Sequence, residues 1–562
     1  MKQLLKTALT AFALIGLSTT AIAQNRVIVT DADINAGDIV TWTANNIYQL
    51  NGQVFVEAGA KLYIEAGTRI EADNGTNTDA AALVITRGAQ IFAEGTPQNP
   101  IVFTSIEDNG TLDETSRGLW GGVVLLGSAT TNNAQEIEVE GLGTITPDGD
   151  NRAFFGGTND EDNSGVMRYV TIRHSGINVG SATGNEIQGL TVAGVGSGTT
   201  LEYIESFASG DDGFEFFGGT VNTRYLVSAF NADDSFDWDQ GFRGKHQFWF
   251  AIQAADEAGR VAEMDGAGGN ENTSPFASPI VANVTFVGAG IDAAPAGDGE
   301  EMLMFRDNTS AFYYNSIFTD FGSSDVGTAI TVEDIDNGGS KPFDSRQRLE
   351  NDSLIVGNSV WFGFKAGNQL AQFAPQDFVQ TMLGAQGNQL ADPILRGLNR
   401  TVEGKGIDPR PNAGSPALSI ALKNMNDEFF STTTYAGAFS PNDNWMKGWT
   451  TLDEYQYLAD FITSISGDEN NTELPTAVVL DQNYPNPFNP TTTINFSIPQ
   501  AENVRLNVYD IMGREVASLV NNRLSAGSYN FNFDASALST GMYIYRLTAG
   551  NVVFTKKMTL IK

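Results

Sequence analysis

Short apolar runs alternate with polar and turn-forming residues along most of the chain. Between residues 50 and 104, alternation places Val54 and Val56 on one face of a β-strand, and Leu62 and Ile64 on one face of the next. A glycine follows each of these runs and permits a tight corner. Strands this short are not stable alone, so the pattern predicts that they stack as coils around one shared core.

The clearest internal repeat aligns residues 201–219 with residues 223–241 at an offset of 22. Phe214 matches Phe236, and the acidic and glycine positions around them match as well. A period of this length is typical of a solenoid. Helical repeats would need apolar residues at a spacing of about 3.6, which is not found here. The pattern therefore predicts an all-β protein whose body, residues 24–365, is a right-handed parallel β-helix.

The rest of the chain divides into three parts. Residues 366–465 are less regular, and we expect them to cap the last coil, because a solenoid must cover its end. Residues 466–476 are polar, acidic and contain proline, which is typical of a linker. Residues 477–562 alternate in several runs, which predicts a small antiparallel, Ig-like β-sandwich.

The first residues predict export. Lys2 and Lys6 precede an apolar stretch that ends in Ala21-Ile22-Ala23, which is typical of a secretory signal peptide over residues 1–23. A membrane anchor is the alternative, but the stretch is short and contains Ser and Thr. We expect no transmembrane segment in the mature chain. Since the sequence contains no cysteine, a lipoprotein anchor, disulfides and thiolate metal sites are excluded.

The C-terminal region carries the most specific motifs of the chain. They are Leu480–Thr491 (LDQNYPNPFNPT), Val508–Val516 (VYDIMGREV), Leu524–Tyr529 (LSAGSY), Leu538–Tyr543 (LSTGMY) and Lys556–Lys562 (KKMTLIK). In this order they closely resemble the type A C-terminal sorting domain of the type IX secretion system. The resemblance implies that the type IX machinery exports the chain across the outer membrane and that the sorting domain is usually cleaved off. The body would then be released or attached to surface lipopolysaccharide. An ordinary sandwich module for binding is the alternative that strand pattern alone leaves open.

A second resemblance concerns the middle of the chain. The run from Asn185 to Lys245, together with Gly437-Ala438-Phe439, Trp445 and Trp449, resembles a poorly characterised group of secreted bacterial β-helix proteins. That group has no settled activity, so the resemblance supports fold and location and leaves the ligand open.

The net charge of the chain limits the classes of molecule that it can bind. Its formal net charge is −35, and removal of Lys2 and Lys6 with the signal would make it more acidic still. Such a charge disfavours nucleic acid and anionic membranes. It suits cations such as calcium, and the alternative is that the acidity serves only solubility or reflects a saline habitat.

The acidic repeat is the best candidate for a binding site. In neighbouring coils Glu215 would lie beside Asp237, and strands stack about 4.8 Å apart, so the two carboxylates repel by roughly 1–4 kcal/mol. A calcium ion with oxygen ligands would relieve this repulsion. Solvated corner residues are the alternative, because Asp often bonds the backbone at turns. The candidate calcium ligands are Asp211, Asp212, Glu215, Asp233, Asp234, Asp237 and Asp239.

Catalysis has weaker support. Asp237, Asp239, Arg243 and Lys245 are the residue types that a calcium-dependent polysaccharide lyase or a glycoside hydrolase would use, but no specific motif accompanies them. The Gly-His-Gly motif expected of polygalacturonase-type β-helices is absent, and the two histidines, 72 residues apart, form no triad or metal motif.

Three functions remain open from the sequence. The favoured one is a non-enzymatic binding or adhesion module for extracellular polysaccharide or other surfaces. The second is a lyase or glycosidase, and the third is a structural protein of the surface layer or matrix. The residues do not identify the ligand.

Overall fold

The computed structural model describes residues 24–459 and 478–561, apart from residues 76–79, 134–135, 143–149, 180–184, 268–270, 298, 336–343, 402–405, 481, 484–485, 487, 500–501, 513, 525–526, 536–537 and 551. The signal peptide and the linker expected at 466–476 lie outside the described residues. The chain forms two compact units, Met1–Leu458 and Ala459–Lys562, which are considered separately below.

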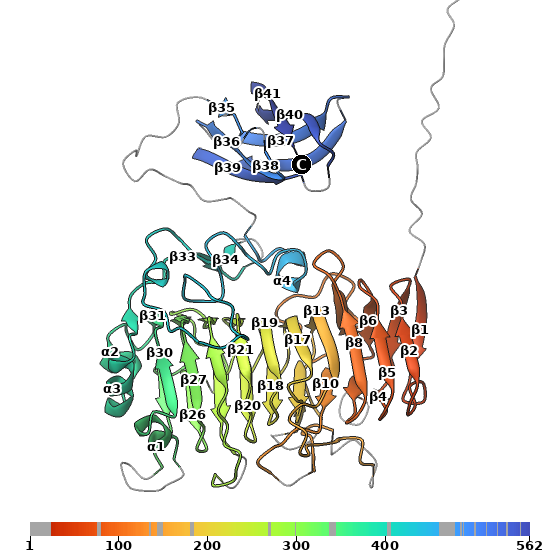
Figure 1. The fold of residues 1–562 in the computed structure, drawn as a ribbon, viewed down its shortest axis with the longest axis vertical. Coiled ribbons are helices and arrows are strands. Elements are labelled where there is room, and N and C mark those ends of the chain that lie inside the picture. Colours follow the sequence, from red (N-terminus) through yellow and green to blue (C-terminus); the bar gives the residue numbers. More distant parts are fainter. Residues whose placement is uncertain are drawn as a thin grey trace, which may run out of the picture. The chain divides into compact units, whose positions relative to one another are not determined.

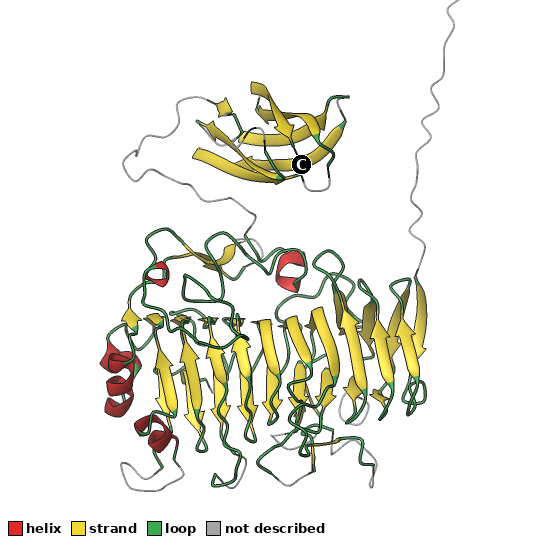
Figure 2. Cartoon of the chain, viewed as in Figure 1, coloured by secondary structure: helices red, strands yellow, loops and turns green. Residues whose placement is uncertain are grey.

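The first unit is a parallel β-helix, as predicted (Figure 1). Each coil contributes strands to three faces, and each strand pairs in parallel with its counterpart in the next coil. Faces one and two are joined into a 19-stranded sheet by three long strands that run around the corner between them, and face three is a 9-stranded sheet. Figure 2 shows how strands dominate this unit.

The strands of face one are β2 (Ile39–Trp42), β5 (Lys61–Ile64), β8 (Gln90–Glu94), β21 (Lys245–Gln247), β24 (Ile280–Ala282), β27 (Ala311–Tyr314) and β30 (Leu354–Gly357). Those of face two are β1 (Asn25–Val29), β3 (Asn46–Leu50), β6 (Arg69–Ala72), β9 (Ile101–Ser105), β22 (Phe250–Ile252), β25 (Thr285–Val287), β28 (Ile317–Phe321), β31 (Val360–Phe364) and β32 (Gln389–Leu390). The strands that span both faces are β13 (Gly165–Arg173), β17 (Thr200–Phe207) and β19 (Asn222–Ala229).

Face three carries the candidate site. Its strands are β4 (Gln53–Val56), β7 (Ala82–Ile85), β10 (Val123–Leu126), β16 (Leu190–Ala193), β18 (Phe214–Phe217), β20 (Phe236–Asp239), β23 (Ala262–Asp265), β26 (Glu301–Arg306) and β29 (Thr328–Val332). Two short antiparallel pairs lie in the loops around it: β11 (Ile137–Glu138) with β12 (Phe154–Phe155), and β14 (Ile177–Asn178) with β15 (Glu186–Ile187).

The 22-residue repeat corresponds to one coil. Phe214 of β18 lies in register with Phe236 of β20, and their rings stack with centroids 5.3 Å apart inside the coil. Trp249 stacks on Phe236 at 4.4 Å, and all three rings are fully buried. Stacked aromatic rings of this kind bury large apolar areas, so the inward positions of the repeat build the core.

The corner between faces one and two has a left-handed backbone at the same position in successive coils. Tyr169, Tyr203 and Tyr225 have φ values of 51°, 56° and 58°, and their rings stack at 4.4 and 4.2 Å. Later coils place Asn283 and Asn315 there, at φ values of 55° and 57°. Asn tolerates this conformation better than other non-glycine residues, because its short polar side chain bonds locally.

Replacing Asn315 with Ala is expected to lower the free energy of unfolding by about 2 kcal/mol. The Asn315 amide donates to the carbonyl of Lys423 at 3.0 Å and accepts from the Lys423 N–H at 2.8 Å, and alanine would lose both bonds. Urea unfolding of both proteins measures the difference, and a loss below 0.5 kcal/mol, roughly the scale of an ordinary surface substitution, would show that the corner bonds contribute little.

The last coil is covered by helices. These are α1 (Ser345–Glu350), α2 (Leu370–Phe373) and α3 (Asp377–Ala385), and Phe373, Val379 and Leu383 pack into the continuous core. The region expected to be a cap thus covers the end only as far as about residue 385. The pair β33 (Leu395–Asn399) and β34 (Gly406–Pro411) then begins a segment that turns back toward the first coils.

We call residues 406–458 the strap. It includes the short helices Pro416–Leu418 and α4 (Thr451–Glu454) and lies against the outside of face two. Phe439, Trp449 and Leu452 of the strap share a buried apolar cluster with Phe207 and Phe230 of the coils. This packing differs from the predicted end cap, because the outward residues of face two in its middle coils, among them Val227, Phe250 and Val287, are apolar and need a cover.

The second unit is an antiparallel sandwich, as predicted. One sheet holds β35 (Val479–Leu480), β36 (Thr491–Ile498) and β39 (Gly527–Asp534), and the other holds β37 (Glu502–Asp510), β38 (Glu515–Leu524), β40 (Gly541–Ala549) and β41 (Val552–Leu560). Ile494, Leu506 and Leu547 are among the buried residues between the sheets.

Candidate functional site

The acidic repeat projects from the outside of face three. Glu215 of β18 lies in register with Asp237 of β20, while the flanking Phe216 and Trp238 point into the core. Alternation along the strand therefore separates the carboxylates from the aromatic rings, as the repeat predicted.

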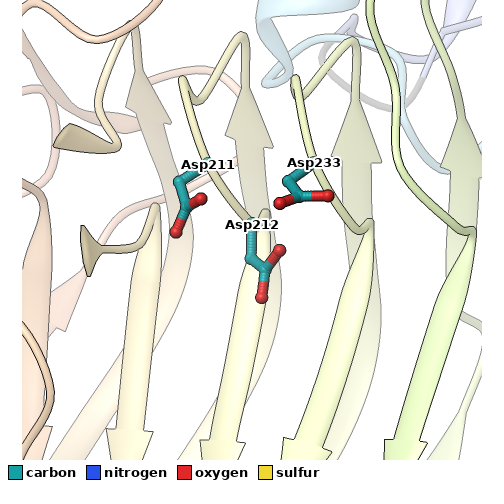
Figure 3. Close-up of side chains that lie close together, drawn as sticks. All are labelled: Asp211, Asp212 and Asp233. Atoms are coloured by element: carbon teal, nitrogen blue, oxygen red, sulfur yellow. The ribbon is translucent and has the colours of Figure 1, made fainter. Parts of the chain in front are cut away.

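The corner residues of the same coils bring more carboxylates beside them. Asp211, Asp212 and Asp233 each offer an oxygen atom within 4.8 Å of the others. Figure 3 shows these three side chains close together on neighbouring coils. A second group of the same compactness joins Asp212 to Glu215 and Asp237. Asp212 belongs to both groups, so the two form one continuous cluster, which we call the acidic cluster.

Two of the predicted ligands are committed to the backbone. Asp234 is buried, and its Oδ1 accepts from the N–H of Arg260. Asp239 likewise accepts from the N–H of Gln240. Asp212 also bonds the chain through the Asp234 N–H at 2.9 Å, but it remains within reach of Glu215 and Asp237.

The structure adds carboxylates that the 22-residue repeat did not identify. Glu263 of β23 lies in register with Asp237, and Asp265 follows two residues later on the same strand. The alternating run Val261–Asp265 was the signal that could have found them. Glu140, which lies in the loop between β11 and β12, is close enough to Glu215 to raise the pKa of that side chain, and no repeat marks this position.

The later coils neutralise their own carboxylates. Arg260 pairs with Glu263 at 3.0 Å and with Glu301 at 2.8 Å, and Arg306 pairs with Asp265 at 2.7 Å. In the part of the chain that the structure describes, no Lys or Arg nitrogen lies within 4.0 Å of the carboxylates of Asp211, Asp212, Glu215 or Asp237. On face three, arginine side chains thus pair with carboxylates of β23 and β26, whereas the carboxylates of β18 and its corner, and Asp237 of β20, have no such partner among the described residues.

This arrangement changes the ionisation of the cluster. Burial and the neighbouring Glu215 carboxylate raise the pKa of Asp237 well above its ordinary value. Burial together with Asp211 does the same to the pKa of Asp212. Burial and Glu186 raise the pKa of Glu140 to about 7. Charged carboxylates are therefore costly here without a counter-ion.

Among the described residues, one oxygen atom of the acidic cluster and one beside it lack hydrogen-bond partners. Oδ1 of Asp237 is buried and accepts no hydrogen bond. Oε1 of Gln188 is also unpartnered, on a side chain that is only 2% exposed, while its Nε2 donates to Glu215 at 2.6 Å. Buried acceptors without partners are rare and costly, so both point to a ligand that supplies positive charge.

The donor set fits a hard cation. Asp212, Glu215 and Asp237 offer carboxylate oxygens, and rotation of the Gln188 amide would turn an amide oxygen toward Glu215. Carboxylate and amide oxygens are the ligands that calcium takes, usually six to eight in number.

The structure places the basic residues elsewhere. Arg243 contacts Asp160 at 3.4 Å and the Thr130 carbonyl at 3.2 Å, and Lys245 pairs with Asp427 of the strap at 2.5 Å. Both histidines are fully buried, and burial lowers the pKa of His174 to about 4 and that of His246 to about 3. Arg243 and Lys245 thus form ion pairs within the body, and the two histidines are part of its interior.

The fold and the comparisons with known families agree on the class of protein: a β-helix body followed by a sorting sandwich. Residues 33–373 match the family of the pectate-lyase-like β-helix domain, and the chain belongs to that family. Residues 482–562 match the secretion system C-terminal sorting domain. No curated protein matches the chain significantly.

The sorting domain establishes the destination of the protein. It directs the chain to the type IX secretion machinery, and the protein is secreted or attached to the cell surface. Among the described residues, no helix is long and apolar enough to cross a membrane.

Proposed function

We propose that the body is a calcium-dependent binding module for anionic polysaccharide at the cell surface. The observation that carries the proposal is the pair of unpartnered buried oxygens, on Asp237 and Gln188, at carboxylates that pair with no Lys or Arg in the described part of the chain.

A cation explains how so acidic a protein could bind an anionic glycan. With a net charge of −35 the chain repels polyanions, but a divalent ion held by the acidic cluster inverts the charge at that place. With one oxygen atom from each of the three carboxylates and the amide, four of the six to eight positions of calcium are filled, so sites remain for ligand oxygens. A uronate carboxylate has the charge and the geometry to fill them.

Binding is favoured over lyase chemistry because, among the described residues, the Arg and Lys side chains considered for proton abstraction do not lie at the cluster. Arg243 and Lys245, the residues considered for proton abstraction, are held in ion pairs with Asp160 and Asp427. Arg306, the basic side chain of β26, is likewise paired with Asp265 at 2.7 Å.

Calcium is expected to stabilise the protein, and Asp237→Asn is expected to abolish the effect. At a free calcium concentration one hundred times the dissociation constant, one site adds about 2.7 kcal/mol to the free energy of unfolding. Urea unfolding in EDTA and in calcium measures this gain. The control is Asp292→Asn, which alters an exposed carboxylate outside the cluster and should leave the gain intact.

A glycan array with the purified protein tests the ligand. Binding of uronic-acid polymers in calcium, lost in EDTA and in Asp237→Asn, is the expected result. Calcium-independent binding would overturn the bridging role of the ion. Release of unsaturated sugars would replace the binding module with a lyase.

A further inference from the structure

The first coil of the β-helix has an open end. Strand β1 pairs with β3 and β2 pairs with β5, and among the described residues neither strand has a partner on its other side. At the far end, α1, α2 and α3 lie against the last coils (Figure 1). A solenoid normally covers both terminal coils, because an exposed edge strand readily pairs with another chain.

The hydrogen bonds show which backbone groups of this edge are free. The carbonyl of Val29 accepts a hydrogen bond from the N–H of Asn51 at 2.9 Å. The backbone N–H and C=O groups of Val29 therefore point toward the second coil. Since N–H and C=O groups alternate in direction along a strand, those of Arg26 and Ile28 point away from it. In β2 the carbonyl of Trp42 accepts a hydrogen bond from the N–H of Glu65 at 2.9 Å. By the same alternation, the backbone N–H and C=O groups of Ile39 point away from the neighbouring coil.

The side chains at this edge are more apolar than an exposed edge should be. Ile39 is 74% exposed, Ile28 is 60% exposed and Val27 is 38% exposed. Natural edge strands usually carry Lys, Pro or a bulge that discourages pairing. Neither β1 nor β2 contains a proline, and Arg26, the one basic residue of the two strands, already pairs with Glu71 at 2.6 Å.

We propose that this edge is an interface with a second copy of the same chain. Two β1 strands related by a two-fold axis through Val27 would pair antiparallel, with Asn25 opposite Val29 and Arg26 opposite Ile28 of the second copy. This register places no like charges opposite each other, and Val27 meets Val27 of the second copy at the two-fold axis. The interface is therefore complementary to itself.

The covered far end makes the assembly a closed dimer. Head-to-tail stacking would require matching free edges at both ends, whereas at the far end α2 and α3 contact β29 and β30, and the last strand of face two, β32, has only two residues. Only the two first coils can meet, so growth ends at two copies. In the dimer the two β-helices form one longer solenoid that carries two acidic clusters.

Sedimentation velocity over a range of concentrations tests the proposal on the chain from Gln24, the residue expected to follow signal cleavage. The wild-type chain should sediment as a dimer that dissociates on dilution. Ile39→Lys should raise the dissociation constant at least about tenfold, because the interface would have to desolvate a charge where an apolar side chain stood. Ile28→Pro should act similarly, because it removes a free N–H and leaves the bonds to β3 in place.

Ile511→Lys is the matched control, since Ile511 is 70% exposed but lies in the sorting domain. It should leave the dimer unchanged. A wild-type chain that stays monomeric at high concentration, or that forms open polymers, would overturn the proposal. So would a dimer that survives both edge variants while their melting temperatures match the wild type.

Discussion

Replacing Arg260 with Gln is expected to lower the free energy of unfolding of the body by about 3–5 kcal/mol, because removal of one partner leaves buried charge uncompensated. Arg260 joins Glu263 and Glu301 at 3.0 and 2.8 Å, and these three side chains are 12%, 13% and 9% exposed. No water can replace the guanidinium well at such burial. Urea unfolding at constant calcium concentration measures the loss.

Arg346→Gln is the control for this change. Arg346 also pairs with two carboxylates, Asp334 and Glu350, both at 2.9 Å, but Glu350 is 48% exposed. The replacement of Arg346 should lower the free energy of unfolding by no more than about 1 kcal/mol, because exposed ion pairs usually contribute no more than that. Equal losses at the two sites would mean that burial of the Arg260 network adds nothing. In the double variant Arg260→Gln/Glu301→Gln, part of the lost stability should return.

The attachment of the strap is expected to weaken as the pH rises toward 8. Glu205 of β17 is fully buried and accepts from the backbone N–H groups of Thr451 and Leu452 at the start of α4. Burial raises the pKa of Glu205 from its ordinary 4.5 to about 7, although the Thr451 bonds and the Arg173 guanidinium act in the opposite direction. The folded protein therefore binds this proton more tightly than the unfolded chain.

The sign of the effect follows from this difference. The contribution of Glu205 is fully present below about pH 4.5 and is lost as the pH rises through 7, which amounts to about 3 kcal/mol. Urea unfolding at several pH values, in constant calcium, measures wild type against Glu205→Gln, which cannot ionise. The difference between them should shrink or reverse by that amount between pH 4.5 and 8.

Glu202→Gln provides the comparison on the same strand. Glu202 is 25% exposed and pairs with Arg168 at 3.0 Å, so its replacement should change stability by less than about 1 kcal/mol throughout the range. A pH profile of Glu205→Gln parallel to that of the wild type would show that Glu205 does not titrate in this window.

The coils could be predicted from the sequence because their contacts repeat. An offset of 22 residues aligned Phe214 with Phe236 and Glu215 with Asp237, and both pairs lie in register. Strand alternation then assigned the aromatic rings to the core and the carboxylates to the outside. The 22-residue offset and the strand alternation were sufficient because each coil contacts mainly its neighbours.

The rest of the site depends on contacts that have no period. Gln188 precedes the repeat and meets Glu215 only because β16 stacks on β18. Arg243 lies close to Asp239 in the sequence, yet its guanidinium contacts Asp160, because the corner after β20 turns it aside. The region after residue 365 has apolar clusters but no repeat, so its return along face two could not be distinguished from an end cap.

The strap has a consequence for the order in which the chain folds. Its last residues bond to groups far away in the sequence: Glu454 to Arg173 and Tyr455 to Asp108, separations of 281 and 347 residues. Closing loops of this size costs roughly 2–3 kcal/mol more chain entropy than closing a single coil. Coils can form one after another as the chain becomes available, whereas Phe207 and Phe230 stay uncovered until the strap arrives. Completion of the body is thus a late, slow step with high contact order. A chain that ends before Phe439 would leave the apolar outer surface of face two exposed, and this surface would promote aggregation.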